Sequence, residues 1–314
     1  MTSIRKTSMM NKKTNPRLLI DGMILVNKPM GLTSNAVLQQ VKNLFCAKKA
    51  GHTGSLDPLA TGMLPICFGE ATKFSQYLLD ADKCYEVTGL LGIKTNTADA
   101  LGDVIARVDE FDISDQAFND ILSEFRGSIK QVPSMFSALK HQGKPLYKFA
   151  REGIEIARVA RDIVIHDLQM NAFDGREFKL TVRCSKGTYI RNLVEDIGER
   201  LNVGAHVIQL HRSYTAGLEK EVMFSLDELA LKSSDERLAC LLPTDRAIDY
   251  MPKYVLTVEL ASEIRLGKPV YINDMSDFVG LIRLYDNQQQ FIGLGERESL
   301  GVLKPKRLIQ FNGS

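Results

Sequence analysis

Apolar residues recur along the chain with two different spacings, one typical of strands and the other typical of helices. An unbroken apolar run predicts a strand at 22–26, and alternation of apolar with polar residues predicts a half-buried strand at 176–185. Apolar residues three and four apart predict a helix with Ser34 as its N-cap and a second helix that begins near Ser114. The same reasoning places further strands at 83–92 and 205–210 and further helices at 70–80, 145–152 and 190–201.

The order of these elements indicates a fold class. Strands and helices alternate irregularly and form no regular βαβ units, so we expect a mixed α+β domain rather than a doubly wound sheet. From Tyr254 onward the pattern changes to short β-type runs between turn residues, which predicts a small β-barrel-like domain after a boundary near 243–252. The strands predicted for this second domain are 254–258, 269–272, 278–285, 291–294 and 307–311.

Composition narrows the class of protein. With 314 residues, of which 44% are hydrophobic and 25% charged, the chain can bury a substantial core. This composition excludes collagen-like and largely disordered proteins. No uncharged apolar run reaches the ~18 residues that span a bilayer, which excludes an integral membrane protein. The five cysteines are too widely spaced for a Cys-x-x-Cys site, and the histidines form no His-Glu-x-x-His motif, so we expect no metal.

Charge is distributed unevenly along the chain, although the net charge is only +2. Residues 1–20 contain five Lys or Arg and no acidic residue, and they lack the apolar core of a secretory signal, so we expect a basic, disordered leader. A second basic stretch, 140–161, carries six Lys or Arg against two Glu. This stretch is either a phosphate-facing patch or an ordinary solvated face, and charge alone does not decide between them.

The segment 51–62, GHTGSLDPLATG, is the most informative candidate for chemistry. Its three glycines allow backbone conformations that other residues avoid, and Asp57 precedes a proline, which favours an extended conformation. Such a carboxylate either caps N–H groups in a turn or reaches into a cleft as a catalytic group. A competing motif, Ser137-Ala-Leu-Lys140, matches the Ser-x-x-Lys pattern of serine acylases, but the other motifs of those enzymes are missing.

Six ordered segments of the chain resemble the bacterial TruB family, the tRNA pseudouridine-55 synthases. They include GMILVNKPMGLTSN at 22–35, the loop with Asp57 within 48–79, and CSKGTYIRNLVEDIG at 184–198; the others are 83–103, 131–156 and 204–213. The resemblance extends from Gly22 to about residue 250, and the remainder resembles a PUA-type RNA-binding module more loosely. One departure is Asn96, where the family usually has Asp in a T-D-T-x-D motif.

The resemblance implies a fold and a reaction. The fold is the α+β pseudouridine-synthase domain at 21–250, a mixed, mainly antiparallel sheet with flanking helices, followed by a PUA-like β-barrel at 251–314. The reaction detaches one uracil of the tRNA T loop at N1 and rejoins it through C5, without metal or cofactor. Asp57 corresponds to the catalytic aspartate, which attacks the sugar or the base or removes a ribose proton, and Arg191 corresponds to the arginine that pairs with it.

The resemblance also assigns residues that bind the RNA. Tyr85 corresponds to the tyrosine that stacks on the flipped base and is a candidate to take its C5 proton. Tyr189 and Leu210 match the uridine pocket, and His52 matches the histidine that fills the space left by extruded nucleotides. The expected phosphate contacts are Lys28, Lys73, Lys140, Lys144 and Lys148.

Three interpretations of function stay open. The first is a stand-alone isomerase acting on the T-arm of tRNA, a cytoplasmic monomer with no membrane and no obligate protein partner. The second is a guide-RNA-dependent, dyskerin-like synthase, although the His-Thr-Gly before Ser55-Leu-Asp57-Pro58 favours the stand-alone branch. The third is an RNA-folding chaperone that opens the tRNA elbow by binding, which is compatible with the first.

Overall fold

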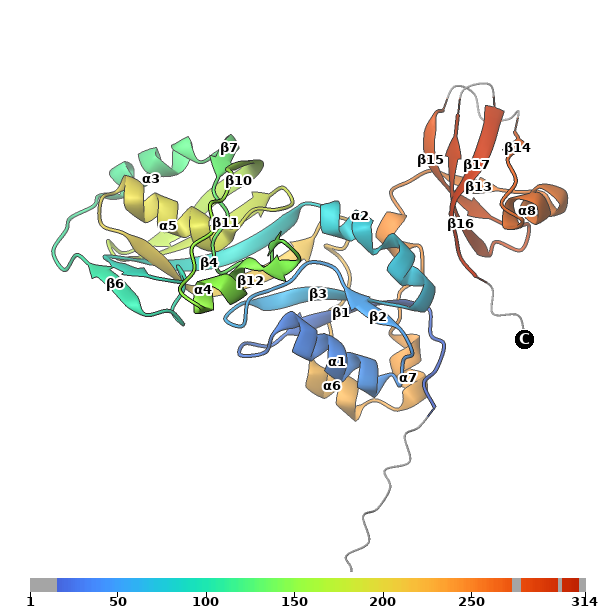
Figure 1. The fold of residues 1–314 in the computed structure, drawn as a ribbon, viewed down its shortest axis with the longest axis horizontal. Coiled ribbons are helices and arrows are strands. Elements are labelled where there is room, and N and C mark those ends of the chain that lie inside the picture. Colours follow the sequence, from blue (N-terminus) through green and yellow to red (C-terminus); the bar gives the residue numbers. More distant parts are fainter. Residues whose placement is uncertain (1–15, 273–277, 299–300, 311–314) are drawn as a thin grey trace, which may run out of the picture.

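The computed structural model describes residues 16–272, 278–298 and 301–310 (Figure 1). Most of the predicted leader and the last residue of the predicted strand 307–311 therefore lie outside the described residues. The described chain forms a large sheet with flanking helices, and a smaller C-terminal sheet lies at one end of it (Figure 1). No helix of the described residues is long and apolar enough to cross a membrane.

The large sheet is mixed and mainly antiparallel, as predicted. Between the strands of this sheet that the structure describes, the one parallel pairing joins β12 to β3, with Thr61 and Gly62 opposite His211 and Arg212. The strand order is β1 (Gly22–Lys28), β3 (Thr61–Phe68), β12 (Ala205–Thr215), β4 (Lys83–Leu91), β11 (Glu177–Cys184), β10 (Arg161–Phe173) and β7 (Gly127–Gln131), and β2 (Ala50–His52) pairs with β3. The sequence pattern did not predict β10, because its irregular burial and its β-bulges obscure the alternation.

Two groups of helices cover the sheet. The helices α3 (Asp115–Glu124) and α5 (Ile190–Arg200) pack on β10, β4 and β12 around a core that includes Phe118, Leu193 and Phe178. On the other half, α1 (Ser34–Leu44) packs with α6 (Leu226–Leu231) near β1. Further elements of this part are η1 (Gly69–Phe74), α2 (Ser75–Asp80), β5 (Ile93–Thr95), β6 (Val104–Arg107), α7 (Ser234–Ala239) and η2 (Arg246–Ile248).

The start of α1 differs from the prediction. Thr33, not Ser34, is the N-cap, because the Thr33 side chain accepts a hydrogen bond from the backbone N–H of Ala36 at 3.1 Å. Ser34 is buried, and its hydroxyl contacts the backbone of Leu56 instead. The prediction was wrong by one residue since adjacent Thr and Ser are equally good caps, and only tertiary contacts distinguish them.

The C-terminal sheet contains the strands β13 (Lys253–Val255), β15 (Gly280–Tyr285), β16 (Phe291–Arg297), β17 (Val302–Leu308) and β14 (Val270–Tyr271) in that order. The predicted strand 254–258 is too long, because α8 (Val258–Arg265) begins there with Thr257 as its N-cap. This helix buries Ala261 and Ile264 against the sheet. The arrangement is consistent with the expected PUA-like module.

The two sheets share an apolar cluster. Phe74 of η1 contacts Phe291 of β16 with ring centroids 5.4 Å apart, and Leu294 packs in the same cluster as Met23 and Met63. At the polar margin, the Arg283 guanidinium donates to Asp245 at 2.9 Å. The C-terminal sheet is therefore packed against the large sheet rather than tethered only by a linker.

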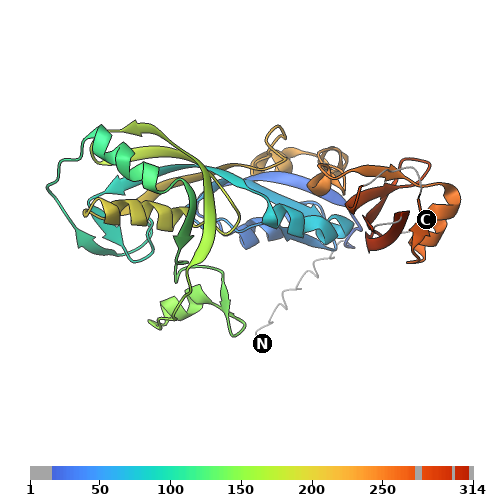
Figure 2. The ribbon, with the colours of Figure 1, turned by 90° about the horizontal axis from the view of Figure 1, so that it is seen from above.

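One segment projects from the body on the side seen at the bottom of Figure 2. It contains the two-stranded hairpin of β8 (Lys140–His141) and β9 (Lys144–Pro145), followed by α4 (Leu146–Arg151). We call residues 140–151 the projecting segment. Pro145 is the N-cap of α4 rather than its first residue, one position from the prediction.

Candidate active site

Asp57 lies in the loop between β2 and β3, and two buried side chains hold this loop. The Ser34 hydroxyl accepts from Leu56 N at 2.7 Å and donates to Leu56 O at 3.0 Å. The fully buried Lys28 ammonium donates to the carbonyl oxygens of Pro29 at 2.9 Å and Ala60 at 2.6 Å. Asp57 is thus fixed on both sides, and 40% of its side chain stays exposed.

Arg191 pairs with Asp57, as the resemblance implied. Its Nε lies 2.8 Å from Asp57 Oδ2, and only 5% of its side chain is exposed. The other two guanidinium nitrogens are also used, because Nη1 donates to Thr97 O at 2.7 Å and Nη2 donates to Phe136 O at 2.9 Å. Since every nitrogen has an acceptor, the guanidinium has one orientation, and it directs the carboxylate.

Asp99 is a third charged group at this centre, and we did not predict it as a site residue. It is buried, accepts from the Thr97 hydroxyl at 2.8 Å and from Leu101 N at 3.0 Å, and lies 3.8 Å from Arg191 Nη1. The sequence feature that could have identified Asp99 as a site residue is its place at the end of the T-x-T-x-D motif. Asn96, the departure from that motif, bonds to Asp103 instead, so it stabilises the neighbouring turn rather than the Asp57–Arg191 pair.

A cavity of about 350 Å³ opens above Asp57. Tyr85 of β4, Tyr189 at the start of α5 and Leu210 of β12 line it, together with Arg191. The structure therefore brings together five residues that the resemblance had placed in one site. A carboxylate oriented by an arginine, beside aromatic and aliphatic walls, can act as nucleophile or base on a planar, uncharged ligand.

The surroundings of the Asp57 carboxylate shift its pKa in opposite directions. Removal from bulk water raises the pKa of Asp57 above its usual value, while Arg191 and Lys28 favour the charged form and Asp99 disfavours it. Burial lowers the pKa of Lys28 to about 8, although Asp57 opposes that change. Burial likewise raises the pKa of Tyr85 and of Tyr189, so both phenols are neutral near pH 7.

Arg212 is a second residue that sequence reasoning missed. Its side chain is buried, with Nε donating to Met63 O at 2.7 Å and Nη2 to Gly54 O at 3.1 Å. Its positive charge also opposes the rise in the pKa of Tyr85 that burial causes, and Arg212 is the β12 residue opposite Tyr85. Only the strand register brings these two residues together, so no local sequence signal marked Arg212.

His52 lies on β2, opposite Ile66 of β3, and does not line the cavity above Asp57. Its Nδ1 is buried and has no hydrogen-bond partner among the described residues. Burial lowers the pKa of this imidazole, and the nearby Arg212 acts in the same direction. His52 is therefore placed beside the Asp57 loop as a neutral side chain.

The five lysines expected to contact phosphate differ in availability. For Lys28 the expectation was wrong, because its ammonium is buried and bonded to the Asp57 loop. Lys73 donates to Glu70 at 2.6 Å and to Leu308 O at 2.9 Å, so it joins η1 to the C-terminal sheet. Lys144 donates to Glu152 at 2.7 Å, whereas Lys140 and Lys148 are exposed and have no ion pair in the described part of the chain.

Two alternative chemistries find no support in the geometry. Ser137 is buried and Lys140 is exposed on β8, so the Ser-x-x-Lys match is not a helical nucleophile–base pair. Among residues 16–272, 278–298 and 301–310, no three His, Cys, Asp or Glu side chains converge as metal ligands.

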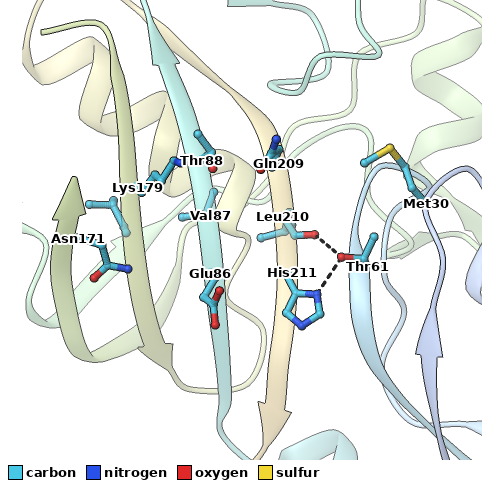
Figure 3. Close-up of a pocket in the computed structure, with 11 residues that line it drawn as sticks. Met30, Thr61, Glu86, Val87, Thr88, Asn171, Lys179, Gln209, Leu210 and His211 are labelled. Atoms are coloured by element: carbon cyan, nitrogen blue, oxygen red, sulfur yellow. Dashed lines mark hydrogen bonds between the residues drawn. The ribbon is translucent and has the colours of Figure 1, made fainter. Parts of the chain in front are cut away.

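A second concavity of about 340 Å³ lies on the opposite face of the large sheet (Figure 3). Glu86 lines it directly after Tyr85 on β4, and successive strand residues face opposite sides of a sheet. His211 Nδ1 contacts the Thr61 hydroxyl at 2.8 Å there, and Lys179 lies at its margin (Figure 3). This face lacks the Asp57–Arg191 pair.

Comparison with known proteins identifies related chains. The family model for the N-terminal domain of TruB family pseudouridylate synthases matches residues 42–190. The C-terminal domain model of tRNA pseudouridylate synthase B matches 191–249, and the C-terminal model of pseudouridine synthase II TruB matches 252–309. Proteins called tRNA pseudouridine synthase B are similar over most of their length: one from Legionella pneumophila strain Philadelphia 1 is 58% identical over 93% of this chain and 96% of its own, and one from Tolumonas auensis is 50% identical over 94% of each.

Solved structures resemble the fold. An archaeal box H/ACA sRNP Nop10–Cbf5 complex matches with a TM-score of 0.69 and 21% identity over 93% of this chain and 87% of that chain. A Cbf5–Nop10–Gar1 complex matches with a TM-score of 0.70 and 22% identity over 93% and 86%. At this identity the likeness establishes the shared fold alone. The family-model matches and the high identity to full-length relatives, together with that fold, show that the chain belongs to the TruB family of pseudouridylate synthases.

Proposed function

We propose that this chain isomerises uridine-55 in the T loop of tRNA to pseudouridine. The relatives that are 50–58% identical over most of its length are called tRNA pseudouridine synthase B, and the chain belongs to their family. The observation that carries the proposal is the Asp57–Arg191 pair, 2.8 Å apart, at the floor of a cavity lined by Tyr85, Tyr189 and Leu210.

Asp57 is the reacting group in this proposal. Its ionised carboxylate either forms a bond to the sugar or base or removes a ribose proton, and both routes need the orientation that Arg191 supplies. The uracil leaves through N1, turns within the cavity and rejoins through C5, whose proton is lost. Tyr85 stacks on the base, and because its phenol is neutral near pH 7 we assign uptake of the C5 proton to a water beside its hydroxyl rather than to the phenol itself.

Reaction requires that the target nucleotide leave the stacked loop, because its glycosidic bond is otherwise out of reach. Tyr85 and Leu210 offer an aromatic face and an aliphatic wall to the extruded base. We assign His52, beside the Asp57 loop, to the space that the extruded nucleotides vacate. Its neutral imidazole suits stacking against bases.

The RNA backbone is proposed to contact the projecting segment and the C-terminal sheet. Lys140, Lys148 and Arg151 are exposed cations of that segment without an ion pair within the described residues, and the two lysines are the phosphate contacts retained from the expected set. We divide the chain at about residue 250 into a catalytic part and an RNA-binding part, the latter resembling a PUA module. Phosphate contacts of this kind position the RNA without reading its sequence.

One experiment separates the stand-alone from the guide-dependent reaction. Purified protein is mixed with unmodified tRNA transcript alone, and pseudouridine is mapped at each position by mass spectrometry. Product at position 55 without any added RNA or protein supports the proposal, and product only after a guide RNA is added contradicts it. Mass measurement of the same preparation tests the expected monomer, and cell fractionation tests the expected cytoplasmic location.

A tRNA-folding activity is a second proposal, because opening the tRNA elbow needs only the binding contacts. The carboxylate of Asp57 contributes none of the proposed phosphate contacts, so an Asp57→Asn variant should still accelerate refolding of misfolded tRNA. A variant without any effect on refolding would contradict this second activity while leaving the first intact.

A further inference from the structure

A basic notch of about 180 Å³ lies at the base of the projecting segment, outside the cavity above Asp57. Lys140, His141, Arg158 and Arg161 provide its polar lining, and no carboxylate lines it. Its floor is apolar and includes Leu139 and Leu146. A concave site with cations at its rim and no acid suits an anion rather than a neutral or cationic ligand.

The cations of the notch are not equally available. Arg158 Nη2 contacts Glu155 at 3.2 Å, so its charge is already partly neutralised. Arg161 and Lys140 are exposed, and neither has a hydrogen bond or ion pair from its side chain within the described residues. A phosphate would supply the hydrogen-bond acceptors and the negative charge that these two side chains lack within the protein.

The notch adjoins the cavity that holds Asp57. Leu139 lines both spaces, so they lie next to each other. Arg161 lies opposite Gln131 in the β10–β7 pairing, and the Gln131 amide exchanges two hydrogen bonds with the backbone of Tyr189, at 2.8 and 3.0 Å. Burial raises the pKa of Tyr189, and the positive charge of Arg161 opposes that rise, as expected of close neighbours.

We infer that this notch binds a backbone phosphate next to the target uridine, with Arg161 as its principal ligand and Lys140 as the second. The planar guanidinium can hold two phosphate oxygens at once, and the lysine adds a point charge. Held in this way, the phosphate fixes the backbone on one side of the extruded nucleotide while the base occupies the cavity over Asp57. The inference rests on the proposed function, since it takes the ligand to be the RNA substrate.

The test pairs protein variants with RNA in which one phosphate has lost its charge. T-arm hairpins carry a methylphosphonate at the linkage on the 5′ or the 3′ side of the target uridine, and binding is titrated for wild type, Arg161→Gln, Lys140→Gln and Lys179→Gln. Lys179 is the matched control, because it is an exposed lysine on the opposite face of the sheet (Figure 3).

With ordinary RNA we expect Arg161→Gln to weaken binding about tenfold, Lys140→Gln less, and Lys179→Gln hardly at all. One of the two methylphosphonates should weaken wild-type binding about tenfold, yet leave the already weakened binding of Arg161→Gln unchanged. The salt dependence of Arg161→Gln binding should fall by about 0.7 to 0.9 in log–log slope.

Two results would overturn the notch assignment: Arg161→Gln binding that matches Lys179→Gln, or methylphosphonate effects that are equal in wild type and Arg161→Gln. Isomerisation of the ordinary hairpin by wild type is recorded in the same series. Wild-type protein that binds the hairpin but forms no pseudouridine would refute the proposed function. The comparison of binding between variants and methylphosphonate hairpins would still show whether the notch holds a phosphate.

Discussion

The floor of the cavity and the projecting segment hold their charged groups in contrasting ways. At the floor, Arg191 is 5% exposed and all three of its guanidinium nitrogens have acceptors, while Lys28 and Ser34 fix the loop that carries Asp57. In the projecting segment, Lys140 and Lys148 are exposed and have no ion-pair partner among the described residues. One region is organised before any ligand arrives, whereas the other keeps these two lysines free of ion pairs, although Lys144 beside them is paired with Glu152.

This contrast indicates that the two regions have different roles, one in the reaction and the other in RNA binding. A reacting group gains most from fixed orientation, because misplacement by about 1 Å can cost about 10²-fold in rate. Phosphate contacts gain little from such precision, since charge acts over several ångströms and the RNA backbone is repetitive. We therefore expect changes at the floor to alter rate and changes at the projecting segment to alter affinity.

The largest effect is expected from Asp57→Asn. The amide can neither form the covalent bond nor accept the proton, so isomerisation should fall by about 10⁴-fold or more. Affinity for tRNA should stay within about tenfold of wild type, because phosphate and stacking contacts carry binding. The rate is measured as release of the C5 hydrogen from labelled uridine, and rapid turnover by the variant would remove Asp57 from the reaction.

Arg191→Lys should lower kcat by about 10²-fold or more while leaving the charge unchanged. An ammonium cannot replace the three separate contacts of the guanidinium with Asp57, Thr97 O and Phe136 O. Single-turnover rates at saturating RNA test this expectation, and circular dichroism serves as the control for folding. Rates equal to wild type would mean that the ion pair does not orient Asp57.

The junction between the two sheets offers a test of stability. Phe291→Ala removes a half-buried ring that contacts Phe74 and Tyr285, with centroids 5.4 and 5.5 Å away. We expect a loss of about 2 kcal/mol in the free energy of unfolding, followed in urea. Tyr271→Ala, at an exposed ring on the same sheet, should leave stability unchanged; equal losses in both variants would contradict a shared core.

The activity should also depend on pH in a stated direction. Because burial raises the pKa of Asp57 above its reference value of 3.8, the carboxylate becomes ionised only above that value. As only the ionised form reacts, kcat at saturating RNA should rise with pH through this raised pKa. An acidic limb at or below 3.8 in the pH profile would show that Arg191 outweighs the effect of burial.

The smallest expected effect concerns two neighbouring lysines of the projecting segment. Lys148→Gln should lower the log–log salt slope of RNA binding by about 0.7 to 0.9, because it removes one phosphate contact. Lys144→Gln should leave the slope unchanged, since Lys144 is already paired with Glu152 at 2.7 Å. A reversed order of the two slopes would refute the distinction between paired and free cations.

Sequence patterns predicted the local features of this fold well. Periodicity identified α3 and α5, and the Asp57-Pro58 loop was recognised before any contact was known. Failures occurred where tertiary structure decides. Ser34 resembles a helix cap until its contact with Leu56 is seen, and Lys28 resembles a surface lysine until its burial is seen.

The same reason explains the missed site residues. Arg212 and Tyr85 are far apart in the sequence and meet only through the register of β12 and β4. Arg161 begins a strand that the periodicity did not mark, so its position beside Gln131 and Tyr189 was not visible. Roles that depend on cross-strand neighbours need the fold, because no spacing within one segment records them.

The division of labour between the two regions is tested most directly by one single-turnover titration. Asp57→Asn and the double variant Lys140→Gln/Arg161→Gln are compared with wild type over a range of T-arm RNA concentrations. We expect Asp57→Asn to lose the maximal rate yet to bind RNA with nearly the wild-type half-saturation. The double variant should reach nearly the wild-type maximal rate at a half-saturation raised about tenfold or more. A double variant with normal half-saturation and a lost maximal rate would contradict the assignment of Lys140 and Arg161 to binding.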